Sequence, residues 1–283
     1  MNRILIPTDF SPHADKAVEY GLGIARKTGA SIRLLHVTEN MEGFGIDNVI
    51  PAEEIQKGFD SSGIEKLNLL KSSIESTESV MVETEVKHGA ITESILNAAK
   101  ECNADLIVVG TFGVTGLKEA LFGSKTAALI GQSSVPIIAI PLEYEGGMLP
   151  AKFLLAIHDA KEAGEQLELF YELAKSFHAT ITLTSFTDIS YVAPTEYPEE
   201  MTELVKAAAV VKEKTTYLMV DTKQLLGKRF IDNINQFVLE NGYNLVVMTT
   251  HERSLLSSII NPSLTKKMSY KTKVPLLALP VRS

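Results

Sequence analysis

The stretch DLIVVGTFGVTGLKEALFGSKTAALIGQSSVPIIAIP, residues 105–141, decides the fold. Its two apolar runs, 106–109 and 137–140, contain no charged residue and no polar alternation. Such runs indicate strands that are buried on both faces, as in a parallel sheet covered by helices on each side. The segment 124–132 between them predicts a helix, and a glycine-rich loop precedes that helix. The order is therefore strand, glycine-rich loop, helix, strand.

A second copy of this pattern lies near the C-terminus. NLVVMTTHE at 244–252 and VPLLALP at 274–280 repeat the two apolar segments, and 30 residues separate their starts in both copies, so the copies align without a gap. Upstream, AVEYGLGIARKTGASIRL aligns with QLELFYELAKSFHATITL. The segment EYEGGMLP contains two glycines and a proline, which is typical of a linker. We therefore predict two domains, 1–142 and 151–283, joined by a linker at 143–150.

The remainder of the first copy predicts a regular alternation of strands and helices. Ser11-Pro12 supplies an N-cap and a first-turn proline, and apolar residues at helical spacing follow until Gly29. The predicted strands are 4–6, 31–37, 80–87, 105–109 and 136–140, and helices are predicted after 12, 53, 91 and 124. The fold class is α/β, with two tandem doubly wound five-stranded parallel sheets and right-handed crossovers. Such sheets bind ligands at the carboxyl ends of their strands.

The composition limits the partners and the compartment. The chain has 283 residues, of which 45% are hydrophobic and 22% charged, and a net charge of −8, which disfavours binding to nucleic acid or to an anionic membrane. The single cysteine, Cys102, excludes an intramolecular disulfide. The sequence contains no run of about 18 apolar residues, so it predicts no membrane-spanning helix. We expect a cytoplasmic protein with no membrane or nucleic acid partner.

The glycine-rich loop has two physical explanations that the residues alone leave open. A loop that runs into a helix N-terminus presents backbone N–H groups and the positive end of the helix dipole, which suit a phosphate. Alternatively, the glycines end a strand and permit close packing. A Walker A motif is excluded, because Ser124 breaks its Gly-Lys-Ser/Thr order.

The spacing Gly110-x2-Gly113-x9-Gly123-Ser124, after DLIVVG and before VPIIAIP, resembles the nucleotide-binding signature of universal stress proteins. The segment ILIPTDFS, 4–11, is similar to the first strand of that family. The resemblance implies a Rossmann-like domain of the adenine nucleotide alpha hydrolase type. It implies a ligand, ATP or a related adenine nucleotide with or without Mg²⁺, and either a homodimer or an internal pseudo-dimer.

The resemblance also implies roles for individual residues. Asp9 would contact the nucleoside, and backbone near Val37 would contact the adenine edge. The loop glycines and the start of the following helix would contact the ribose and the phosphates. The implied nucleotide-binding residues are Pro7, Thr8, Asp9, Val37, Gly110, Thr111, Gly113, Gly123, Ser124 and Lys125. Helix capping is the alternative role of Asp9. Thr111-Phe112 replaces a small polar residue and an arginine common in the family, and Lys118 or Lys125 is the candidate replacement for that charge.

The second copy has lost this signature. The gap-free alignment places Thr249, Glu252, Leu255 and Pro262 on the four loop glycines, and only Ser124 is kept, as Ser263. We therefore predict that the second domain binds no ATP and serves as half of an internal pseudo-dimer. A metal site is a minor alternative there, and its candidate ligands are His158, Asp159, His251 and Glu252.

No sequence motif indicates a catalytic centre. We interpret His13, His36, His88 and His178 as capping or surface residues, and the acidic loop from Glu39 to Glu54 as either a lid or a variable surface loop. The leading hypothesis is a nucleotide-binding regulatory or stress-response module, and any enzymatic activity is expected to be at most a weak ATPase. The alternatives are a slow ATPase or phosphotransferase and a ligand-free scaffold.

Overall fold

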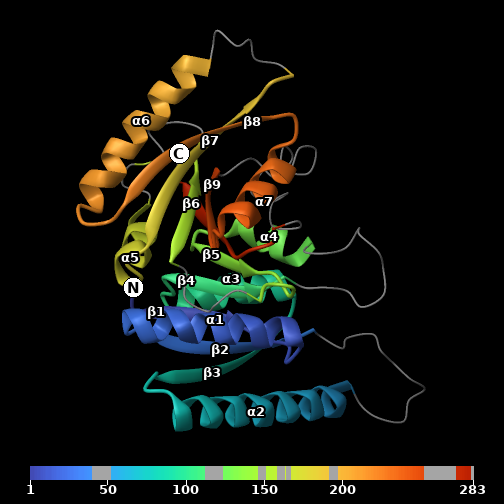
Figure 1. Cartoon of the computed structure of the whole chain (residues 1–283). Coiled ribbons are helices and arrows are strands. Elements are labelled where there is room, and N and C mark those ends of the chain that lie inside the picture. The colour runs from blue at the N-terminus through green and yellow to red at the C-terminus, as the bar shows by residue number, and fades with distance from the viewer. Residues whose placement is uncertain are drawn as a thin grey trace.

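The computed structural model describes residues 1–39, 52–111, 124–145, 151–157, 163, 167–190, 197–251 and 272–281. Strands and helices alternate along the chain, as predicted (Figure 1). The first half contains β1 (Arg3–Pro7), α1 (Pro12–Thr28), β2 (Ser31–Thr38), α2 (Ala52–Thr77), β3 (Val82–His88), α3 (Ile91–Glu101), β4 (Leu106–Gly110), α4 (Ser124–Gln132) and β5 (Ile137–Ile140). The second half contains β6 (Lys152–Ala156), α5 (Glu168–Ser176), β7 (Thr180–Asp188), α6 (Tyr197–Lys214), β8 (Val220–Gly227), α7 (Phe230–Asn241), β9 (Leu245–His251) and β10 (Leu276–Val281).

All the described strands form one sheet of ten, in the order β3-β2-β1-β4-β5-β10-β9-β6-β7-β8. Within each half the neighbouring strands are parallel, but β5 pairs with β10 in the antiparallel sense. The two predicted parallel sheets are therefore joined edge to edge into one mixed sheet. The sequence does not indicate this join, because the apolar runs of β5 and β10 resemble those of any other buried strand.

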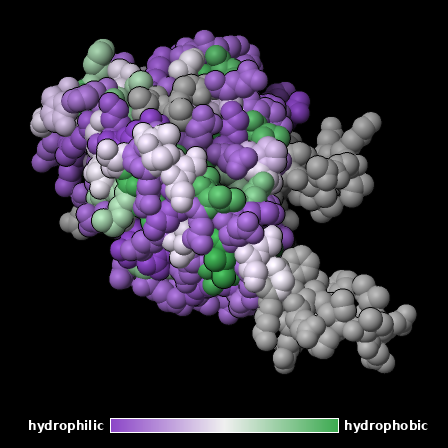
Figure 2. Space-filling view, turned by 90° about the horizontal axis from the view of Figure 1, so that it is seen from below, coloured by the Kyte–Doolittle hydropathy of each residue, from purple (hydrophilic) through white to green (hydrophobic). Residues whose placement is uncertain are grey.

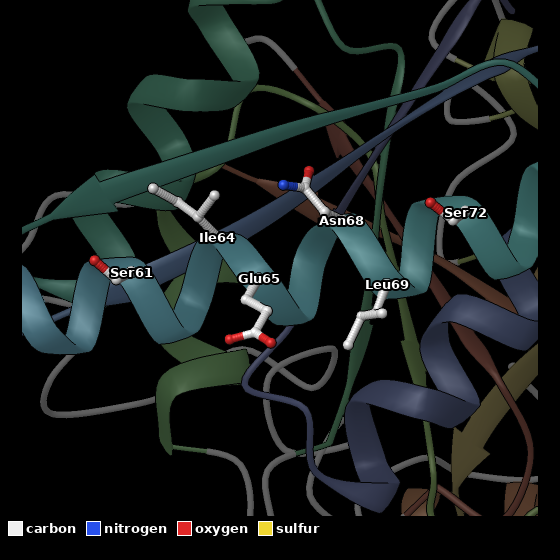
Figure 3. Close-up of a pocket in the computed structure, with 6 residues that line it drawn as sticks. All are labelled: Ser61, Ile64, Glu65, Asn68, Leu69 and Ser72. Carbon is white, nitrogen blue, oxygen red and sulfur yellow. The ribbon is translucent and has the colours of Figure 1, made fainter.

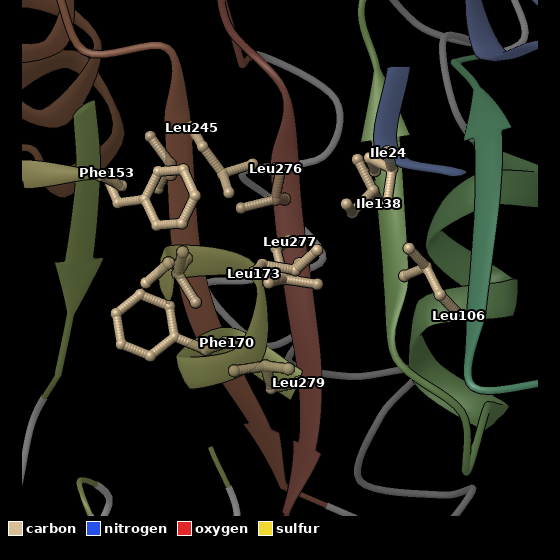
Figure 4. Packing of buried hydrophobic residues seen from close by; sticks show 14 of the residues in the cluster. Ile24, Leu106, Ile138, Phe153, Phe170, Leu173, Leu245, Leu276, Leu277 and Leu279 are labelled. Atoms are coloured by element: carbon tan, nitrogen blue, oxygen red, sulfur yellow. The ribbon is translucent and has the colours of Figure 1, made fainter. Parts of the chain in front are cut away.

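The strand register confirms the gap-free alignment of the two copies. Ile107 pairs with Ile137 in the first half, and Val246 pairs with Leu276 at the corresponding positions of the second. At the join, Ile138 lies opposite Leu277, which is its own counterpart in the other half. The join is therefore symmetric, and Ile138 and Leu277 both lie within the continuous core shown in Figure 4.

The same hydrogen-bond device fixes the start of the first strand in each half. The Asp105 carboxylate accepts hydrogen bonds from the backbone N–H groups of Asn2 and Arg3, at 2.5 and 3.0 Å. The Asn244 side-chain oxygen accepts from the two corresponding N–H groups, of residues 151 and 152, at 3.0 and 2.9 Å. Asp105 stands immediately before β4 and Asn244 immediately before β9, so each side chain aligns its own strand with the central strand of its half, β1 or β6.

Helices cover both faces of the first half of the sheet. Ile4 and Ile6 belong to the core cluster that includes Leu67 of α2, whereas Leu5 belongs to the cluster that includes Ile95 of α3. This alternation of neighbouring residues between two cores is the pattern of a doubly wound sheet. None of the described helices is long and apolar enough to cross a membrane.

Replacing Leu277 by alanine tests the join between the halves. Leu277 is fully buried in β10, so Leu277→Ala should lower the free energy of unfolding by about 3 kcal/mol through lost burial and a residual cavity. The matched control is Leu239→Ala, because the Leu239 side chain on α7 is 59% exposed, and it should change that free energy by less than about 0.5 kcal/mol. Urea denaturation measures both, and equal effects would contradict a core that runs through the join.

Candidate functional site

The candidate site lies where the strand order of the first half reverses. In the order β3-β2-β1-β4-β5, the chain progresses from β1 in one direction to β3 and in the other from β4 to β5, so β1 and β4 flank the switch point. Ligands of doubly wound sheets bind in the crevice outside the carboxyl ends of such strands. Asp9 follows β1, Gly110 ends β4, and Lys125 lies at the start of α4 on the same edge. Val37 is the penultimate residue of β2, the strand that pairs with β1.

A tight turn between β1 and α1 directs Asp9 outward. Thr8 is buried, and its hydroxyl accepts a hydrogen bond from the N–H of Phe10 at 3.0 Å. Phe10 adopts a left-handed backbone conformation with φ of 62°, which is uncommon for a residue other than glycine. The Asp9 carboxylate accepts hydrogen bonds from the backbone N–H and the hydroxyl of Ser11, at 3.1 and 2.5 Å. Asp9 therefore stabilises the entry to α1, and its side chain is exposed beside the switch point.

An aromatic wall closes the α2 side of this turn. The rings of Phe10 and His36 lie 4.8 Å apart, and the Lys66 ammonium is 5.3 Å from the centre of the Phe10 ring. His36 Nδ1 donates to the Thr8 carbonyl at 2.8 Å. A Cβ atom on Gly63 would lie 2.8 Å from the His36 ring, so this glycine lets α2 approach it. His36 is thus a packed part of the wall, which corrects our interpretation of it as a capping or surface residue.

Gly110 has a packing role of its own. A Cβ atom there would lie 2.2 Å from the carbonyl oxygen of His13, in the first turn of α1. Of the two explanations that the sequence leaves open for the loop glycines, close packing therefore applies to Gly110. The adjacent Thr111 is buried, and its N–H donates to the Ile140 carbonyl at 2.9 Å. The lack of a side chain at Gly110 therefore allows α1 to pack closely against β4 at the switch point.

The start of α4 faces the end of β2. The buried Thr126 hydroxyl donates to the Gly110 carbonyl at 3.5 Å, which fixes the first turn of α4 against β4. Lys125 then reaches Glu39, with 3.8 Å between its ammonium and the Glu39 carboxylate. The predicted ligand residues Gly113 and Gly123 lie outside the described residues, as does the Ser124 side chain.

One surface depression formed by described residues lies along α2. It measures about 480 Å³ and follows one flank of α2 (Figure 3), and its lining residues are Ser61, Ile64, Glu65, Asn68, Leu69 and Ser72. Viewed from the α2 side, the surface carries small hydrophobic areas among hydrophilic side chains (Figure 2). A depression along one helix offers no converging polar groups. We therefore place the candidate site at the switch point.

The metal alternative receives no support from the described residues. Among them, no group of three or more His, Cys, Asp or Glu side chains could hold a metal ion. The strand register shows which residue of the second copy corresponds to Asp9, because the Ile157 N–H bonds to the Thr184 carbonyl as the Thr8 N–H bonds to the Leu35 carbonyl. By this count His158, and not Asp159, corresponds to Asp9, although His158, Asp159 and Glu252 lie outside the described residues.

Two doubly wound halves, with a crevice at the switch point of the first, define a Rossmann-like α/β protein of tandem architecture. A family model for the universal stress protein family matches residues 1–141 and again residues 151–280, and the chain belongs to this family as a two-domain member. It is 30% identical over 138 residues to Universal stress protein MJ0531 of Methanocaldococcus jannaschii, a match that covers 49% of this chain and 81% of that protein. It is 29% identical over 146 residues to Universal stress protein YxiE of Bacillus subtilis, which covers 49% and 98%.

A solved structure extends the likeness in fold to both halves. The crystal structure of a universal stress protein from Archaeoglobus fulgidus superimposes with a TM-score of 0.74, at 20% identity, over 99% of this chain and 98% of that one. The tandem arrangement therefore has a counterpart of similar size and fold.

Substituting Gly110 tests its packing role. Because its missing Cβ would collide with backbone atoms of His13, Gly110→Ala should lower the free energy of unfolding by more than about 2 kcal/mol, with no nucleotide present. The control is Gly58→Ala in α2, where nothing lies within 4 Å of an added Cβ, and it should leave stability unchanged or raise it by up to about 1 kcal/mol. Thermal denaturation of both variants measures the difference. A Gly110→Ala protein as stable as the wild type would contradict the packing role.

Proposed function

We propose that the first half binds one adenine nucleotide, ATP or a close relative, and that the protein acts as a nucleotide-responsive regulatory or stress-response module. One observation supports this above the others: the described members of the predicted signature meet at the switch point of the first half. These members are Pro7, Thr8, Asp9, Val37, Gly110, Thr111 and Lys125. Membership of the universal stress protein family supports the same ligand class.

The chemistry of the edge suits a nucleotide lying from β2 towards α4. The exposed Asp9 carboxylate can accept hydrogen bonds from a sugar hydroxyl or a base amine. The start of α4 offers backbone N–H groups, the positive end of its dipole and the Lys125 ammonium, all of which favour phosphate. In this proposal Gly113, Gly123 and Ser124 complete the phosphate site, and bound Mg²⁺ would neutralise part of the phosphate charge.

The second half is proposed to bind no nucleotide. Thr249 occupies the position of Gly110, and the matching register of β4 and β9 supports this correspondence. Glu252 and Pro262 would add negative charge and remove an N–H donor on the phosphate path. The β5–β10 pairing would then stand in place of a homodimer contact, with the second half as its structural partner.

The proposed regulatory role requires that nucleotide bind two conformations with different affinity. At the switch point the Ser11 hydroxyl donates to the Asp9 carboxylate, but its oxygen also accepts from the Ala14 N–H as the N-cap of α1, so we assign this pair to helix capping and not to catalysis. Phosphate release above background would favour the slow ATPase or phosphotransferase, and failure to bind any nucleotide would favour a ligand-free scaffold.

Native mass spectrometry tests the number of sites. The wild-type chain should bind one ATP per chain, and Gly113→Glu should abolish this binding by placing a carboxylate beside the phosphates. Gly146→Glu in the predicted linker is the matched control and should still bind one ATP. Two nucleotides per chain would contradict a silent second half, and none would overturn the proposed function.

Asp9 and Ser11 separate nucleotide binding from helix capping. Asp9→Ala should weaken ATP binding about tenfold to a hundredfold, through loss of hydrogen bonds to a charged acceptor. Ser11→Ala removes the N-cap bond to Ala14 and the hydroxyl that bonds to Asp9, so it should lower the free energy of unfolding by about 1 kcal/mol and weaken ATP binding much less than Asp9→Ala does. Calorimetric titration and urea denaturation of both variants give the two quantities. Equal loss of affinity in both would assign Asp9 a capping role only.

A further inference from the structure

We propose that Glu39 is a specificity-determining residue of the nucleotide site, which competes with ligand phosphate for the Lys125 ammonium. The Glu39–Lys125 bridge thereby makes the affinity for a nucleotide depend on its phosphate chain and leaves the affinity for the nucleoside alone unaffected. This inference rests on the proposed function and concerns a residue outside the predicted signature.

The bridge crosses the candidate crevice. Glu39 follows the last residue of β2, whereas Lys125 lies at the start of α4, which follows β4. Because β1 separates β2 from β4 in the sheet, the ends of these two strands stand about two strand spacings, or roughly 10 Å, apart, and the Thr126–Gly110 bond ties the first turn of α4 to the end of β4. The two side chains span this gap to within 3.8 Å of each other. A phosphate chain running from the switch point to α4 therefore meets the bridge.

Neighbouring residues hold the Glu39 end of the bridge in place. The Thr38 carbonyl accepts from the Gly89 N–H at 3.0 Å, and the Thr38 hydroxyl lies 2.7 Å from Nδ1 of His88. Nε2 of His88 in turn lies 3.4 Å from the Asp60 carboxylate of α2. His88 is thus part of a three-residue contact that fixes the end of β2 immediately before Glu39. The His88 side chain is itself 44% exposed, which agrees with our interpretation of it as a surface residue.

Lys125 is fixed at its backbone and free to reorient at its tip. The next residue, Thr126, is fully buried and bonded to the Gly110 carbonyl, which sets where the Lys125 side chain begins. The Lys125 and Glu39 side chains are themselves 47% and 70% exposed. An exposed ion pair of this kind is weak and is screened by salt. A polyphosphate, which carries several negative charges, can therefore replace Glu39 as the ion-pair partner of Lys125. The Glu39 carboxylate, left without that partner, then repels the polyphosphate.

Calorimetric titration of Glu39→Gln with ATP and with adenosine tests the bridge. Glu39→Gln should tighten ATP binding about two- to fivefold in low salt, since it removes both the competitor and the repulsion. Adenosine affinity should stay within about 1.5-fold, because the nucleoside does not reach Lys125. The gain for ATP should shrink in 0.5 M salt, where charges are screened over about 4 Å. The double variant with Glu39→Gln and Lys125→Gln should bind ATP only slightly more tightly than Lys125→Gln alone. This gain in ATP affinity should be at most half of the gain that Glu39→Gln gives when Lys125 is present.

The matched control is Glu203→Gln. Glu203 forms a comparable exposed pair with Lys206 on α6 of the second half, so this change alters the net charge equally, and ATP affinity should not move. Unchanged or weaker ATP binding by Glu39→Gln, or equal tightening for adenosine, overturns the bridge while leaving the proposed function intact. Failure of the wild type and every variant to bind either ligand overturns the proposed function and the bridge together.

Discussion

The antiparallel pairing of β5 with β10 is the contact on which the rest of the architecture depends. Each of these strands would otherwise be a sheet edge with unpaired backbone groups, and the pairing satisfies both edges within one chain. Because Ile138 lies opposite its own counterpart, Leu277, both halves contribute the same surface to the contact. The strands of the two halves run in opposite directions. The carboxyl ends of the first-half strands therefore point to one side of the sheet, and those of the second-half strands point to the opposite side. The candidate crevice is consequently described by first-half residues alone.

The two halves show which features the fold needs and which it leaves free to change. The bonds from Asp105 and Asn244 to the start of the central strand are kept with different residue types, because either side chain supplies the required oxygen. The buried strands also keep one register, since a shift by one residue would turn apolar side chains to the wrong face. At the carboxyl edge, in contrast, Gly110 and Thr249 stand at equivalent positions. A duplicated fold can therefore keep its core while its edges acquire different chemistry.

The sequence predicts the local structure well because local patterns determine it. The N-cap at Ser11, the helix end at Gly29 and the apolar run of β4 each act over a few residues. Contacts between distant residues could not be predicted in this way. The collision that requires Gly110 involves His13, 97 positions earlier, and His36 bonds to Thr8 across 28 positions. No spacing rule connects these pairs, so the packing role of Gly110 and the aromatic wall became visible only with the strand order. The nucleotide assignment itself stays a prediction for every residue of the signature.

The proposed assignment has a consequence for the shape of the response to nucleotide. A symmetric pair of identical domains has two equivalent sites, and any coupling between them makes binding cooperative. In this chain the second half is proposed to have no nucleotide site, while the symmetric join is retained. A single site per pair leaves no second nucleotide to couple to, so occupancy within one chain follows a simple saturation curve. The proposed binding half and its partner share one scaffold, because β4, β5, β10 and β9 are consecutive in one sheet. In this proposal one half of the duplication binds nucleotide and the other serves as its structural partner, an arrangement that two identical domains cannot provide.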